Sequence, residues 1–367
     1  MVIWKCEECG KKWRYEIDKC IFCEGKIKLE DIGDLKVIGY TKIFIPSIQH
    51  PEIPYYSLIL EDEKGNRIIQ KSFNKPSMGA YFSLESNGKN PAKRNIIIIG
   101  TGTMGTGIAH LSLIKGFNVI LMGRNEKSLE KAKNRIQERL LKKNTQDETN
   151  QILRRIEYTL NTPNFESTDI IIEAIAEDMR AKKEIFNNIT RVCPSETIIA
   201  SNTSSLSITE LSESISHPER FVGMHFFNPP DKMDLVEIVK GRKTSESTIE
   251  IVKQITTEMN KKPIIVKDSP GFIVNRMLMP FINEAVNLLE EGVASKKDID
   301  EAIKTGLNHP MGPFELADFI GLDVCLAILE SISSNLDEEK YKPSETLIQL
   351  VNNGHLGKKT KKGFYEY

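Results

Sequence analysis

The chain carries almost no net charge, and it lacks any long apolar run. Its 50 lysines and arginines nearly balance 51 aspartates and glutamates, which leaves a formal charge of −1 over 367 residues. So small a charge provides no global field to attract nucleic acid or an anionic membrane. No apolar run reaches the ~18 residues of a membrane-spanning helix, and residues 1–6 lack the apolar core of a secretory signal. We therefore expect a cytoplasmic protein that binds neither nucleic acid nor a membrane.

Cysteine is scarce, yet four of the six cysteines lie within the first 23 residues. They form two CxxC pairs, Cys6 with Cys9 and Cys20 with Cys23. In a reducing compartment such pairs are more typical of zinc than of disulfides, since each turn presents two thiolates to one tetrahedral ion. The alternative is that the pairs are accidental. Residues 1–30 are too few to bury a core, so we predict a zinc ribbon whose folding energy comes from the metal.

The rest of the chain divides by its pattern into three regions. Residues 31–85 contain short β-runs separated by turn residues, which predicts a small β domain resembling a barrel. A stretch of linker composition follows at 86–91. Residues 95–272 alternate strands with amphipathic helices, as in a doubly wound α/β sheet. Residues 273–367 are helical nearly to the end, which predicts a separate all-α domain. In the α/β region we predict strands at 96–99, 118–122, 169–174, 197–201, 221–227 and 235–240.

A glycine-rich turn follows the first of these strands and reads Gly-Thr-Gly-Thr-Met-Gly. A lone GxGxxG motif is a weak signal, but its position between a buried strand and an amphipathic helix is typical of dinucleotide binding. Gly100 permits the tight turn, Gly102 lets the backbone approach the pyrophosphate, and Gly105 lets helix and strand pack closely. Thr103 and Met104 of this turn are further candidates for cofactor contact, and the helix N-terminus that follows is expected to point its free N–H groups at the phosphates.

The end of the second strand bears on the choice of nicotinamide cofactor. NAD-binding proteins carry an acid there, which binds the adenosine ribose. This chain has Gly123 followed by Arg124 instead. Because glycine makes room for a 2′-phosphate and arginine pairs with it, we favour NADP(H) over NAD(H). The alternative, that Arg124 only stacks on adenine or points into solvent, leaves NAD(H) acceptable.

A histidine and a glutamate stand symmetrically about a proline-rich turn centred near Asp231. If the flanking apolar runs pair as antiparallel strands about that centre, His225 lies opposite Glu237, with Cβ atoms ~5 Å apart. A lone histidine in an apolar strand is usually a satisfied core residue. A histidine that faces an acid beside a dinucleotide site better fits a general base with its orienting partner.

Six ordered motifs resemble the 3-hydroxyacyl-CoA dehydrogenase family, and together they span roughly residues 95–367. Besides the glycine-rich turn, they are Ser-Asn-Thr-Ser-Ser-Leu at 201–206, His-Phe-Phe-Asn-Pro at 225–229, Asp-Ser-Pro-Gly-Phe-Ile-Val-Asn-Arg at 268–276, His-Pro-Met-Gly-Pro-Phe-Glu-Leu-Ala-Asp at 309–318 and Gly-Lys-Lys-Thr-Lys-Lys-Gly-Phe-Tyr at 357–365. The resemblance implies a Rossmann-type domain at 95–272, a helical dehydrogenase domain at 273–367, and hydride transfer between a nicotinamide and a 3-hydroxyacyl-CoA.

Carried over by motif position, the resemblance implies that His225 is the catalytic base and Glu237 its partner. Ser204 and Asn275 are expected to be the polar groups around the substrate, although each has an ordinary alternative role at a helix start. The implied cofactor contacts outside the glycine turn are Glu177, Lys182, Asn202 and Lys359. NAD-preferring members carry an acid at the position of Gly123. This difference bears on the choice of cofactor and not on the reaction.

The resemblance also implies a CoA site and a homodimer through the helical domain. Residues 127–155 contain nine lysines and arginines and four acids, which gives a net charge of +5. The family binds CoA on this helical stretch, so Arg139, Lys142 and Lys143 are candidates for its phosphates, with Ser204 near the acyl group. A solvated helix face explains the same charge equally well.

The N-terminal region resembles the zinc ribbon plus OB-fold domain found with acyl-CoA enzymes, on the basis of Tyr40-Thr41, Pro54-Tyr55 and Gly65-Asn66. This resemblance implies docking of a thiolase-type partner or contact with acyl-CoA; a simple structural cap is the alternative. Nucleic-acid binding is disfavoured, because seven basic and six acidic residues leave residues 1–30 with only +1.

Two other functions stay open for the whole chain. A dehydrogenase on the same scaffold can oxidise a polar hydroxyacid without CoA. A non-catalytic acyl-CoA-binding scaffold is disfavoured, because the four implied active-site residues are all present.

Overall fold

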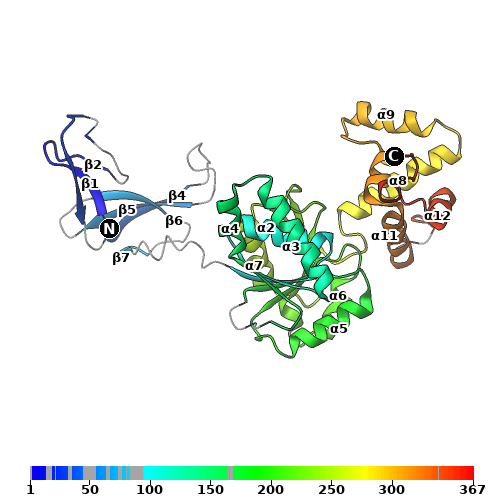
Figure 1. Ribbon diagram of the computed structural model, residues 1–367, viewed down its shortest axis with the longest axis horizontal. Helices are drawn as coiled ribbons and strands as arrows, with labels where there is room; N and C mark the ends of the chain where they lie inside the picture. Colours follow the sequence, from blue (N-terminus) through cyan, green and yellow to red (C-terminus); the bar gives the residue numbers. More distant parts are fainter. Residues whose placement is uncertain are drawn as a thin grey trace. The chain divides into compact units, whose positions relative to one another are not determined.

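The protein forms two compact units, Met1–Ala92 and Lys93–Tyr367, which are shown in Figure 1. The computed structural model describes residues 2–13, 19–20, 22–31, 35–43, 55–62, 67–72, 77–79, 81–82, 94–163, 165, 168–337 and 339–367. The predicted linker at 86–91 lies outside these residues. Within them, no helix combines the length and the apolar character needed to cross a bilayer.

The first unit contains two antiparallel sheets. The smaller has the order β2-β1-β3 and the larger the order β6-β5-β4-β7. Val37, Leu58 and Leu60 are buried in the larger sheet. Closure of this sheet into a barrel stays a prediction, since the residues between its strands are only partly described. The strands are β1 (Val2–Cys6), β2 (Lys12–Trp13), β3 (Ile27–Asp31), β4 (Leu35–Ile43), β5 (Tyr55–Asp62), β6 (Arg67–Ser72) and β7 (Tyr81–Phe82).

An eight-stranded sheet of order β10-β9-β8-β11-β12-β13-β14-β15 is the centre of the second unit. Its strands pair in parallel except β13 with β14, which are antiparallel. The strands are β8 (Asn95–Ile99), β9 (Asn118–Met122), β10 (Ile156–Thr159), β11 (Ile170–Glu173), β12 (Ile198–Ser201), β13 (Phe221–Phe226), β14 (Leu235–Lys240) and β15 (Lys262–Lys267).

All six predicted strands are present, but β10 and β15 were missed. Both are edge strands with little buried surface, and β15 contains Pro263 and is flanked by lysines. Most of their side chains are half-buried or exposed, so these strands lack the continuous apolar run of a strand that is covered on both faces.

Helices cover both faces of the sheet, as a doubly wound fold requires. The core on one face includes residues of α2 (Thr103–Ile114), α3 (Glu126–Leu141) and α7 (Glu246–Glu258). The core on the other face includes residues of α5 (Met179–Thr190) and α6 (Ile208–Leu211). A short helix, α4 (Gln146–Leu153), follows α3. The two cores take alternate residues from each strand; Ile96 and Ile98 face one, and Ile97 and Ile99 the other.

The remaining helices form the all-α domain that the sequence predicts, with a core of their own. They are α8 (Val274–Glu290), α9 (Lys296–Leu307), α10 (Pro313–Ile320), α11 (Leu322–Asn335) and α12 (Glu345–Asn352).

The strand order reverses at the carboxyl ends of β8 and β11. The chain leaves β8 to form β9 and β10 on one side, and then returns to form β11 on the other side. Ligands of open α/β sheets bind where the strand order reverses in this way. Gly100 and Ala174, which follow β8 and β11, meet at this point.

Candidate active site

The glycine-rich turn is packed so that two of its three glycines cannot carry a side chain. Gly100 has φ of +118°, and a Cβ added there would lie 2.4 Å from the Ala174 carbonyl oxygen. A Cβ on Gly105 would lie 2.0 Å from the carbonyl oxygen of Gly100. Gly102, the N-cap of α2, has no atom within 4 Å of an added Cβ and no side-chain cap. The open space before the uncapped helix fits a dinucleotide pyrophosphate.

Thr103 and Met104, which the sequence proposes as cofactor contacts, are the first residues of α2. Met104 packs against the core beneath the sheet, so of these two residues Thr103, which is exposed, is freer to face a ligand.

The β9–α3 turn leaves no room for a side chain at its first residue. A Cβ on Gly123 would lie 2.6 Å from Leu129 Cγ, and Leu129 belongs to the core. Arg124 is exposed, and the next residue, Asn125, caps α3 by accepting a hydrogen bond from the Ser128 N–H.

The proposed base and its partner lie opposite each other, as the symmetry of the turn predicted. Strands β13 and β14 pair His225 with Glu237, and His225 Nδ1 lies 2.7 Å from Glu237 Oε2. Both side chains are buried. The rings of Phe227 and Phe272 contact the imidazole at centroid distances of 4.5 and 5.7 Å. Because β13 is parallel to β12, the histidine lies toward the carboxyl edge of the sheet, where the glycine turn also lies.

Glu237 also connects the histidine to the start of the helical domain. Its Oε1 accepts hydrogen bonds from the backbone N–H groups of Ile273 and Val274, each at 3.0 Å. The next residue, Asn275, donates from its side-chain amide to the Ser204 carbonyl oxygen at 3.1 Å. The first turn of α8 thus contacts both the His225–Glu237 pair and the serine loop after β12.

Glu177 organises that serine loop. Its Oε1 accepts hydrogen bonds from Thr203 Oγ1 at 2.7 Å, from Ser204 N at 2.7 Å and Oγ at 3.0 Å, and from Ser205 N at 3.1 Å. Burial by itself would raise the pKa of this carboxyl. The positive charge of Lys182 and the donors from Thr203 and Ser204 outweigh burial, and the pKa lies below its usual value.

Lys182 is buried, with 1% of its surface exposed. Its Nζ lies 2.6 Å from Glu173 Oε1 and 3.4 Å from Glu177 Oε2. The lysine therefore faces two carboxylates, and its predicted contact with the cofactor stays a prediction. Glu173 was missed from the sequence, although an acid that ends the apolar run Ile-Ile-Ile is an available signal.

Asn202, the first residue after β12, connects the serine loop to strands β11 and β13. Its side-chain oxygen accepts a hydrogen bond from the Phe226 N–H at 3.0 Å, and its own N–H donates to the Glu173 carbonyl at 2.8 Å. Both contacts are within the protein, so its cofactor contact also stays a prediction.

The remaining predicted contacts lie outside the hydrogen bonds described above, and their roles stay predictions. Arg139 is partly buried near Gly107 of α2, and its Nη1 has no hydrogen-bond partner among the described residues. Lys142 and Lys143 are exposed at the end of α3. Lys359 forms an ion pair with Asp323 within the helical domain.

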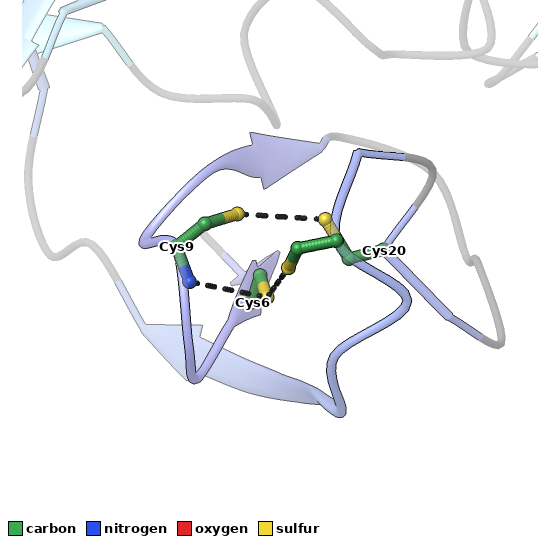
Figure 2. A group of neighbouring side chains, drawn as sticks. Cys6, Cys9 and Cys20 are labelled. Carbon is green, nitrogen blue, oxygen red and sulfur yellow. Dashed lines mark hydrogen bonds between the residues drawn. The ribbon is translucent and has the colours of Figure 1, made fainter.

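The four N-terminal cysteines form one cluster, separate from this site in the chain. Their sulfur atoms all lie within 4.8 Å of one another. Sγ of Cys6 is 3.5 Å from that of Cys23, and Sγ of Cys9 is 3.5 Å from that of Cys20 (Figure 2). A tetrahedral zinc with Zn–S bonds of ~2.3 Å holds its sulfurs about 3.8 Å apart, so the spacing fits this metal.

Two family models match the chain. The NAD binding domain of 3-hydroxyacyl-CoA dehydrogenases matches residues 95–269, and the C-terminal domain of these enzymes matches residues 271–367. Together they cover the part of the chain that carries the six motifs.

Curated relatives and solved structures agree. A probable 3-hydroxybutyryl-CoA dehydrogenase of Bacillus subtilis is 45% identical over 279 residues, covering 75% of this chain and 97% of the relative. The 3-hydroxybutyryl-CoA dehydrogenase of Clostridioides difficile is 43% identical, covering 74% and 99%. The crystal structure of (S)-3-hydroxybutyryl-CoA dehydrogenase from Ralstonia eutropha is similar with a TM-score of 0.72 and 42% identity, covering 75% and 99%. The chain belongs to the 3-hydroxyacyl-CoA dehydrogenase family.

Proposed function

We propose that this protein interconverts an L-3-hydroxyacyl-CoA and the 3-oxoacyl-CoA, with 3-hydroxybutyryl-CoA and acetoacetyl-CoA as its substrate pair. The observation that carries the proposal is the buried His225–Glu237 pair, with 2.7 Å between Nδ1 and Oε2, at the sheet edge that also bears the glycine turn. The family relatives that act on 3-hydroxybutyryl-CoA support this choice of acyl chain.

The hydrogen bonds of Glu237 favour one tautomer of the neutral histidine. Its Oε1 accepts two backbone N–H groups, as an ionised carboxylate does. An ionised Oε2 accepts as well, so the histidine carries its proton on Nδ1 and presents the Nε2 lone pair to the substrate. In the oxidative direction Nε2 takes the proton of the 3-hydroxyl group, and Glu237 stabilises the imidazolium that forms. A nicotinamide held at the glycine turn would supply the acceptor for the hydride that leaves C3.

Ser204 and Asn275 orient the substrate in this proposal. Both lie where the first turn of α8 meets the serine loop. The Ser204 hydroxyl donates to Glu177 at 3.0 Å, so it must turn away from this carboxylate to donate to a substrate oxygen. A hydroxyl and an amide held on two packed elements supply orientation and charge stabilisation.

For the cofactor we favour NADP(H) over NAD(H). The tight packing of Gly123 against Leu129 leaves the ribose end of the site without an acid, and the exposed Arg124 is available to a 2′-phosphate. Replacing Arg124 with Gln is expected to weaken NADPH binding, measured by titration, more than NADH binding. Equal changes would show that Arg124 does not contact the 2′-phosphate.

Arg139, Lys142 and Lys143 are proposed to bind the phosphates of CoA. Nη1 of Arg139 is buried and has no hydrogen-bond partner among the described residues, which supports this role, because a buried guanidinium N–H without an acceptor is unfavourable.

A spectrophotometric assay tests the main proposal. Acetoacetyl-CoA is supplied with NADPH or NADH, and free acetoacetate replaces it in a parallel reaction. We expect the reduced cofactor to be oxidised only when the CoA thioester is supplied. Turnover of free acetoacetate would favour the polar hydroxyacid alternative, and no oxidation with either cofactor would favour a non-catalytic scaffold.

The N-terminal unit is proposed to be a zinc ribbon followed by an OB-like domain that docks a thiolase-type partner. The cluster of Cys6, Cys9, Cys20 and Cys23 supports the zinc site. Metal analysis is expected to find about one zinc per chain, as four thiolates bind one ion; folded protein without metal would contradict the ribbon. We also propose a homodimer through the helical domain, which light scattering measures directly.

A further inference from the structure

A cluster of three charged side chains lies at the carboxyl end of β11, and two of the three are buried. Glu173 is 0% exposed and Lys182 1% exposed. Lys182 Nζ lies 2.6 Å from Glu173 and 3.4 Å from Glu177. One ammonium between two carboxylates leaves the cluster with one net negative charge, provided that both acids are ionised.

The hydrogen bonds of both acids are those of carboxylates. Glu173 accepts from Lys182 Nζ at 2.6 Å, from the Ile175 N–H at 2.7 Å and from Ser201 Oγ at 2.6 Å. Glu177 accepts from Thr203 and from both polar groups of Ser204. Groups that receive only donors, several of them backbone N–H, are stabilised in the ionised form.

The position of the cluster connects it to the reacting end of the cofactor. Glu173 ends β11, and the next residue, Ala174, contacts the glycine turn. Glu177 accepts a hydrogen bond from the Ser204 N–H, and the Ser204 carbonyl accepts one from the side-chain amide of Asn275. A nicotinamide that exchanges hydride near His225 must therefore lie between these contacts, close to the cluster.

We propose that Glu173 keeps this cluster anionic and thereby makes the site bind the oxidised nicotinamide, which carries a positive ring charge, more tightly relative to the neutral reduced form. Glu173 acts through Lys182 and Glu177 and does not itself touch the cofactor, so it is a positioning residue. The inference rests on the proposed use of a nicotinamide cofactor, but it does not depend on the acyl substrate.

Glu173→Gln tests the inference, because glutamine keeps the volume and can bond to Lys182 and Ser201 while it removes the charge. The dissociation constants of NADP⁺ and NADPH, and of NAD⁺ and NADH, are measured by calorimetry without acyl substrate. A unit charge within ~10 Å of the ring predicts that the oxidised form binds on the order of tenfold more weakly, with a change below about twofold for the reduced form. Glu184→Gln, on the exposed side of α5, is the matched control and should leave both constants unchanged.

Two further variants keep the test decisive. Glu173→Asp retains the charge and should largely restore the ratio of the two constants. Glu173→Gln combined with Lys182→Met removes the buried acid together with its ammonium and leaves the single negative charge of Glu177, so the wild-type ratio should be retained even if Glu173→Gln alone fails to fold. Equal changes for the oxidised and reduced cofactors would overturn the inference and leave Glu173 a purely structural role. Wild-type protein that binds no nicotinamide would instead refute the proposed function.

Discussion

The substitution Glu237→Gln separates the orienting role of this carboxylate from its packing role. In the wild type, Oε1 accepts from the N–H groups of Ile273 and Val274 at 3.0 Å, and Oε2 faces His225 Nδ1 at 2.7 Å. A glutamine oxygen can keep the two backbone donors. Its NH₂ group then faces Nδ1, which must become the acceptor, and the histidine proton moves to Nε2. The base that faces the substrate is lost.

The free energy needed to restore the productive histidine tautomer in the variant gives the size of the expected fall in kcat. The amide would have to rotate so that its oxygen meets Nδ1, and its NH₂ group would then face two backbone N–H donors. Two unpaired buried donors cost about 1–3 kcal/mol each. A total of about 2–6 kcal/mol corresponds to a fall in kcat of roughly 30-fold to 10⁴-fold.

Steady-state oxidation of NADPH or NADH by acetoacetyl-CoA measures this fall, and cofactor titration should show unchanged binding. Glu250→Gln is the matched control, because Glu250 is exposed on α7 and its pair with Lys253 contributes little. Thermal unfolding of both variants checks that α8 still packs. A Glu237→Gln enzyme whose kcat stays within about threefold of the wild type would refute the proposed tautomer.

Three other outcomes are expected. His225→Gln should abolish turnover while cofactor titration stays normal, and retained activity would assign the base to another group. Gly105→Ala should weaken cofactor binding, because its Cβ would lie 2.0 Å from the Gly100 carbonyl oxygen and such overpacking costs about 1–3 kcal/mol; wild-type affinity would contradict this packing. The lowered pKa of Glu177 stabilises the fold above the unfolded-state value of about 4.3, and this contribution is lost as the pH falls through the folded pKa. Glu177→Gln should therefore unfold with a shallower dependence on acid pH, and an unchanged dependence would contradict the ionised hydrogen-bonded carboxylate.

The spacing of apolar residues was sufficient to predict a strand or helix where that element is buried on a regular pattern. The isoleucine run before the glycine turn forms a central strand, with alternate residues in the two cores. The pairing of His225 with Glu237 followed from counting residues about a turn, because an antiparallel hairpin relates the two sides by symmetry. The edge strands β10 and β15 were not predicted, because most of their side chains are only partly buried or exposed.

The sequence by itself determined the Rossmann-type α/β architecture with its helical C-terminal domain, the glycine turn and the histidine–glutamate register, because these depend on local periodicity and short-range counting. Only the tertiary structure decided that Lys182 is buried between Glu173 and Glu177, and that Glu237 also binds the first turn of α8. Such contacts join segments separated by up to 37 residues in the chain, and no local pattern encodes which donor a buried carboxylate will meet when the sheet and helices pack.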